Sequence, residues 1–149
     1  MKKFKFRLQR ILDIRTVQEK VKFTVLGQER MKLEDEKHKL NLFEKESESQ
    51  IAQIRTETQK PFKVWSQQSN VGYLKRLDSV IGYQKGAVAQ QEDAVARARG
   101  KYVQAHRDTE SLEKIHEKRL NEWKSETIRE EGHALDEHGM RTHGTGDSR

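Results

Sequence analysis

The stretch QKPFKVWSQQSNVGY, residues 59–73, decides the fold, because it holds the only proline of the chain. Pro61 lacks a backbone donor and clashes with the preceding helical turn, so a helix is expected to end there. Ser69 and Asn70 are residue types that start helices, and either could cap a second one. Long charged stretches without another proline lie on both sides. The sequence therefore predicts one reversal of direction between two long helices.

The composition allows only a narrow apolar interface between these helices. Of the 149 residues, 32% are hydrophobic and 36% are charged, whereas a compact domain draws on about 45 to 50% apolar residues. Disorder is disfavoured, because 30 Lys and Arg nearly balance 24 Asp and Glu and low net charge is untypical of disordered chains. Opposite charges also recur at the spacing that supports exposed helices. A coiled coil fits these proportions.

A seven-residue repeat runs through the second half of the chain and predicts a coiled-coil helix. Small and polar residues at its companion positions indicate a thin interface. The first set of positions is Leu74, Ile81, Val88, Val95, Tyr102, Thr109, His116 and Trp123, and the companion set, three residues later, is Leu77, Gln84, Gln91, Ala98, Ala105, Leu112 and Arg119.

The first half repeats less regularly, so its register is expected to shift along the helix. One frame holds Leu12, Leu26, Leu33, Leu40 and Ile54, and a neighbouring frame holds Leu8, Ile11, Val21 and Val25.

These patterns predict an all-α fold, a long antiparallel two-helix coiled-coil hairpin that forms a single unit over residues 1–138. The first arm is expected at about 4–58, the bend at about 59–70 and the second arm at about 70–136, followed by a flexible tail at 139–149. With the bend centred near residue 66, the basic residues 2–10 should lie beside the acidic stretch 122–130. Trp65 is expected to cover the open end of the interface.

Motifs that carry catalysis or bind cofactors are absent from the sequence. There is no cysteine, no glycine-rich phosphate loop and no zinc-binding histidine pair. The expected hairpin also has no cleft in which carboxylate pKa values could be shifted for catalysis. We therefore expect no enzyme activity, no metal and no cofactor. His116 is expected to help fix the register, and no stretch resembles a signal peptide or a membrane span.

A second apolar stripe follows the bend, beside Leu74 and Ile81. Two helices cannot cover both stripes, so this one is either a docking face for a partner or the seat of a short extra helix near the bend. Its residues are Tyr73, Leu77, Val80 and Gln84.

Four segments together resemble the flagellar FliJ family of type III export proteins. They are FKFRLQRILDIR at residues 4–15, SNVGYLKRLDSVI at 69–81, LEKIHEKRLNEWKSE at 112–126 and EEGHALDEHGMRT at 130–142. The most specific element is ALDE at 134–137, which ends a long charged helix. The glycines around the bend and the glycine and histidine tail depart from the family pattern.

The resemblance implies a non-enzymatic cytoplasmic adaptor, shaped like the central stalk of a rotary ATPase, that acts in flagellum biogenesis and so in chemotaxis. Its implied partners are the hexameric flagellar export ATPase, the regulator of that ATPase, the transmembrane export gate protein and export chaperones. It would associate peripherally with the inner face of the cell membrane at the flagellar base. The implied gate-binding residues are Tyr73, Leu77, Val80 and Gln84, and the implied ATPase-binding residues are Arg7, Arg10, Arg15, Glu130, Glu131, Asp136 and Glu137.

Three alternatives remain open at the level of sequence. One is the equivalent stalk of a virulence type III secretion system, and another is a structural coiled-coil dimer without an ATPase partner. A third is a nucleic-acid or membrane-surface binder that uses the basic N-terminus. We expect no nucleic acid as a partner, and a monomer in isolation.

Overall fold

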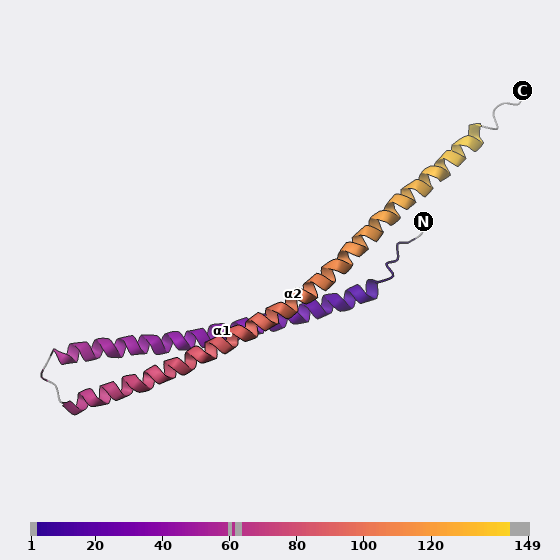
Figure 1. Cartoon of the computed structure of the whole chain (residues 1–149). Helices are drawn as coiled ribbons and strands as arrows, with labels where there is room; N and C mark the ends of the chain where they lie inside the picture. The colour runs from indigo at the N-terminus through magenta and orange to yellow at the C-terminus, as the bar shows by residue number, and fades with distance from the viewer. Residues whose placement is uncertain (1–2, 60, 62–63, 144–149) are drawn as a thin grey trace, which may run out of the picture. The chain divides into compact units, whose positions relative to one another are not determined.

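The chain forms two long helices. The computed structural model describes residues 3–59, 61 and 64–143, with side chains as far as Met140. Helix α1 spans Gln9–Thr58 and helix α2 spans Val64–His143 (Figure 1). Within the described residues there is no strand and no third helix near the bend. The expected helical hairpin is therefore confirmed, and the stripe after the bend is not covered by an extra helix from that part of the chain.

The contacts between the helices fall into two units, residues 20–103 and residues 1–19 with 104–149. In the first unit Phe23 packs on Tyr102 with ring centroids 5.5 Å apart, and Asn70 donates a hydrogen bond to Glu57. A residue early in α1 thus contacts a residue late in this part of α2, and a residue late in α1 contacts one early in α2, so the two helices are antiparallel. In the second unit the order is also antiparallel, since Glu19 contacts His106 and Arg15 contacts Asp108.

The interface follows the seven-residue frame expected for the second helix. The buried residues of α1 and α2 are few, and on α1 Leu26 alone is buried, with 4% of its surface exposed. All the buried residues described on α2 occupy predicted frame positions, so the frame is confirmed. They are Leu77, Ile81, Gln84, Val88, Ala98 and Thr109.

Helix α1 keeps one frame instead of changing register. Steps of seven residues from Leu12 to Ile54 reach only buried or half-buried positions. Two of these positions hold a polar residue in place of an apolar one, Glu19 and Ser47. The neighbouring frame is exposed at Ile11, Val21 and Val25 and half-buried only at Leu8. The expected register shift is therefore wrong, because hydrogen-bonding side chains substitute for apolar ones at this interface.

The bend is shorter than the sequence suggested. Helix α2 begins at Val64, so Asn70 lies inside the helix and its amide donates to the carboxylate of Glu57 at 3.3 Å instead of capping the helix. Trp65 does not cover the interface, since 71% of its surface is exposed. The shorter bend shifts the pairing: Phe6, expected near residue 126, packs on His116. Part of the expected neighbourhood of residues 2–10 and 122–130 is still present, since Phe4 packs on Trp123 and Arg7 shares a groove with Glu122 and Glu126.

The two ends of the chain also differ from expectation. The first helix starts at Gln9, whereas it was expected near residue 4, and the described residues 3–8 are not helical. Helix α2 continues through residues 139–143 of the expected flexible tail. The remainder of that tail, residues 144–149, lies outside the described residues.

Candidate binding surfaces

Basic and apolar side chains alternate along residues 3–8 with a period of two, which is the period of an extended chain. The alternation places one set of side chains against α2 and the other in solvent. The half-buried set is Phe4, Phe6 and Leu8, and the exposed set is Lys3, Lys5 and Arg7. The alternation in KFKFRL was the available signal that residues 3–8 would not be helical, and sequence reasoning missed it.

Four rings form a cluster where residues 3–8 meet α2. His116 contacts Phe4 and Phe6 edge to face, with ring centroids 5.5 Å and 4.8 Å apart. Phe4 also packs on Trp123 at 5.8 Å. Such geometry is favourable for aromatic pairs. His116 and Trp123 are both frame positions, so the phenylalanines continue the interface beyond the start of α1.

A groove of about 650 Å³ lies beside this cluster. Its polar wall includes Arg119, whose Nη1 lies 3.1 Å from a carboxylate oxygen of Glu122. The groove therefore combines an aromatic floor with charges of both signs. Its lining comprises Phe4, Lys5, Phe6, Arg7, Leu8, Ile115, Arg119, Glu122, Trp123 and Glu126.

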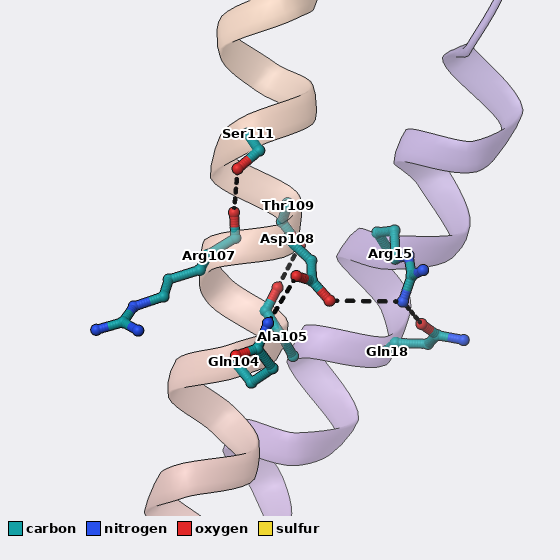
Figure 2. A network of polar contacts seen from close by, with 8 residues as sticks. All are labelled: Arg15, Gln18, Gln104, Ala105, Arg107, Asp108, Thr109 and Ser111. Atoms are coloured by element: carbon teal, nitrogen blue, oxygen red, sulfur yellow. Dashed lines mark hydrogen bonds and ion pairs between the residues drawn. The ribbon is translucent and has the colours of Figure 1, made fainter.

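Arg15, a candidate ATPase-binding residue, belongs to a polar network between the helices (Figure 2). Its Nη1 lies 3.7 Å from Oδ2 of Asp108 and donates to Oε1 of Gln18 at 3.3 Å. Gln104 donates to the other oxygen of Asp108 at 2.9 Å. Because about half of the Arg15 side chain is exposed, this ion pair can rearrange at small energetic cost.

The structure does not bring the basic and acidic candidate residues together. Arg7 lies in the groove with Glu122 and Glu126, and Arg15 lies beside Asp108. The acidic set begins about 33 Å further along α2 than Asp108, at 1.5 Å per residue. Every residue from Ile128 to Met140 except Gly132 is exposed. The acidic set, all exposed, is Glu130, Glu131, Asp136 and Glu137.

The four candidate gate-binding residues do not share one exposed face. Leu77 and Gln84 are buried, each with 7% of its surface exposed. The amide of Gln84 donates to the backbone oxygen of Glu36 on α1 at 3.1 Å. Tyr73 and Val80 remain accessible, with 38% and 42% exposed. The first two belong to the helix interface, and only the second two are available to a partner while α1 and α2 are paired.

Comparison with known protein families gives one match, to the model described as "Flagellar FliJ protein", over residues 4–147. The chain belongs to the FliJ family. The family assignment makes it a component of the flagellar protein export apparatus. No curated protein and no solved structure matches the chain closely enough to count as similar.

Two aromatic residues of this FliJ-family chain are exposed: sequence reasoning missed Tyr83, and it placed Trp65 over the end of the interface instead of on the surface. Tyr83 has 82% of its surface exposed and Trp65 has 71%. Successive steps of three or four residues connect Tyr73, Val80 and Tyr83 through Arg76, so the helix presents them on one flank. Neither Trp65 nor Tyr83 occupies a position of the seven-residue frame, and this spacing was the signal that both side chains would lie on the surface.

Hydrogen bonds lower the pKa of three glutamates of α1, mainly across the interface for Glu19 and mainly from neighbours on α1 itself for Glu29 and Glu36. The pKa of Glu19 is lowered mainly by its hydrogen bond with His106. The pKa of Glu29 is lowered by hydrogen bonds from Lys32 and then Gln91, and that of Glu36 by hydrogen bonds from Lys39 and then Gln84. Each of these carboxylates also has a hydrogen-bond partner on α2.

Two further features bear on the kind of site this FliJ-family chain can hold. Among residues 3–59, 61 and 64–143, no three His, Asp or Glu side chains gather where they could bind a metal ion. Neither described helix contains a stretch apolar enough, over sufficient length, to span a bilayer.

Proposed function

We propose that this FliJ-family protein is a non-enzymatic, central-stalk-like adaptor of the flagellar export apparatus. It binds the hexameric export ATPase and the regulator of that enzyme, reaches the transmembrane export gate, and escorts unloaded export chaperones. It acts in the cytoplasm, at the inner face of the cell membrane. The observation that carries the proposal is the family match over residues 4–147.

The ATPase-binding end uses two charged surfaces of opposite sign. The acidic one, called the upper surface, lies near the end of α2, and the basic one, called the lower surface, is formed by residues 3–10. The upper surface is the single-helix part of α2 from Ile128 to Met140, with its exposed acidic residues. A single helix is about 10 to 12 Å across, narrow enough to enter the central hole of a hexameric ring. The lower surface is basic, since no acid occurs before Asp13. Its exposed residues are Lys3, Lys5, Arg7 and Arg10.

An adaptor of this kind changes the ATPase through unequal contacts. The six subunits of the ring are alike, whereas α2 and the segment beside it present a different surface in each direction. A ligand shifts an equilibrium only if it binds one state better than another. Subunits that meet the basic segment are therefore biased differently from those that meet the bare face of α2.

The gate-binding surface consists of the exposed part of α2 after the bend. Tyr73 and Val80 supply accessible apolar area, and Trp65 and Tyr83 extend it along the same helix. Exposed aromatic residues are the type most often found to dominate protein interfaces. Leu77 supports this surface from inside the helix pair.

The test is the ATP hydrolysis rate of the purified export ATPase from the same organism, with and without this protein. The double variant Arg7→Glu/Arg10→Glu and deletion of residues 1–12 should both abolish stimulation, while far-UV circular dichroism reports an intact helix pair. The matched control is Lys20→Glu/Lys22→Glu, which reverses two exposed cations further along α1 and should stimulate normally. If the first variant stimulates as well as the control does, the stalk proposal fails.

A further inference from the structure

Residues 3–8, named the strap here, precede α1 and lie across the end of the helix interface. The strap contacts α2 through rings: Phe6 packs on His116 with centroids 4.8 Å apart, and Phe4 packs on His116 and Trp123 at 5.5 Å and 5.8 Å. Its backbone turns into α1 where the amide of Gln9 donates to the carbonyl of Phe6 at 3.1 Å. The strap is thus a non-helical cover, with a turn at Arg7 and Leu8, over two frame positions of α2.

The amino-acid order explains why the strap is not simply the first turns of α1. The interface frame of α1 passes through Leu12, and seven residues earlier it would reach Lys5. A helical strap would therefore place a cation at the interface and turn Phe4 and Phe6 to opposite flanks, because each is 100° away from Lys5. The extended form instead places both phenylalanines on α2 and all the cations in water.

Ring contacts are the main attachment of the strap to α2. Among the described residues, no ion pair or side-chain hydrogen bond involves residues 3–8. Helix α1, by contrast, is continuous, and its side chains make polar contacts with α2 from Arg15 to Glu57. Segments with few contacts open at lower free energy than the paired helices they border. The strap should therefore detach without disturbing the rest of the pair.

We propose that the strap is a reversible cover that opens while α1 and α2 stay paired. In the closed form Phe4 and Phe6 shield His116 and Trp123. In the open form these two residues become accessible together with Ile115, which is already 43% exposed. His116 and Trp123 are the frame positions that follow Thr109, so opening exposes the continuation of the interface on α2. The inference depends on the ring contacts and is independent of the proposed ATPase partner.

The experiment uses Trp123 as its own reporter. Trp65 is replaced by Phe, which leaves a single tryptophan because the chain has two. Phe6→Ala and Phe4→Ala in this background should raise the acrylamide quenching constant of Trp123 by about twofold, as expected for a local opening, towards the value of a variant that lacks residues 1–8. Far-UV circular dichroism should stay unchanged. Lys5→Ala, on the solvent side of the strap, is the matched control and should leave quenching unchanged.

Urea then tests whether opening is independent of helix pairing in the Trp65→Phe parent. Quenching of Trp123 should rise at lower urea than the loss of helical signal, because two separate events give transitions that do not coincide. Coincident transitions, or a loss of helix in Phe6→Ala, would mean that the strap is an integral part of the hairpin. Unchanged quenching in both phenylalanine variants would mean that it does not cover Trp123. Any of these results would overturn the proposal.

Discussion

The side-chain amide of Gln91 bonds Glu29 across the helix pair at two points, the backbone carbonyl at 3.1 Å and the carboxylate at 2.6 Å. Gln84 makes the same two contacts with Glu36, one heptad away along each helix. Sliding one helix past the other by a turn would separate both amides from their acceptors. Polar residues at interface positions often specify register in this way, so these two pairs fix which residues face each other.

Loss of one amide should therefore be costly. We expect Gln84→Ala to lower the free energy of unfolding by about 1.5 to 3 kcal/mol, the range for a hydrogen bond to a charged group. Gln90→Ala is the matched control, because Gln90 is exposed on the same helix and its removal should cost less than about 0.5 kcal/mol. Urea unfolding followed by circular dichroism measures both. Equal costs would show that the amide contacts do not hold the helices together.

The same glutamates predict a pH dependence. The pKa values of Glu29 and Glu36 lie below the ordinary 4.5 in the folded chain, so the unfolded chain binds more protons in that range. The stabilisation is complete above pH 4.5 and is lost as the pH falls from 4.5 through the lower folded values. Glu29→Gln/Glu36→Gln should be less stable at neutral pH and should lose less stability between neutral pH and pH 3. Thermal unfolding at a series of pH values measures this, and parallel profiles would contradict it.

The sequence predicted the helices better than their pairing. The seven-residue frame from Leu74 to Trp123 follows from apolar spacing alone, and the structure uses it. The pairing was displaced by about ten residues at Phe6, because serine and asparagine were assigned to the bend although they also occur inside helices. Bend length sets the partner of every interface residue, so one local error moved the whole register.

The candidate surfaces were harder to predict for a related reason. Leu77 and Gln84 were assigned both to the companion positions of the seven-residue frame and to the stripe after the bend, and the structure places them at the interface with α1. The strap was missed because the alternation in KFKFRL covers only six residues, and the helical pattern that follows it was extended back to residue 4.

The glycines of α2 give a prediction about stability. A Cβ added at Gly82, Gly86 or Gly100 would meet no atom within 4 Å, so none of them is needed for close approach within the described chain. Replacing each by alanine should stabilise the helix by up to about 1 kcal/mol. Thermal unfolding of the three single variants and the triple variant measures the gain. A triple variant no more stable than the parent would mean that this part of α2 is not helical in solution.

The distinction between buried and exposed members of the stripe after the bend leads to a prediction about gate binding. Tyr73→Ala/Val80→Ala should weaken binding to the cytoplasmic domain of the export gate by at least about tenfold, because tyrosine is among the residue types that most often dominate the binding energy of an interface. The variant should unfold like the parent, since both residues are accessible. Leu77→Ala should instead destabilise the helix pair by about 2 to 3 kcal/mol through the cavity it leaves. Its effect on binding should follow only from the fraction unfolded.

Calorimetric titration of the gate domain together with urea unfolding separates the two effects. Lys75→Ala/Asp78→Ala, which alters exposed polar residues within the same turns, is the matched control and should bind normally. If Tyr73→Ala/Val80→Ala binds as tightly as this control, the exposed flank of α2 is not the gate surface. If Leu77→Ala loses binding while retaining full stability, the helices must separate here for the partner to reach Leu77, and the paired form would then be the resting form of the protein.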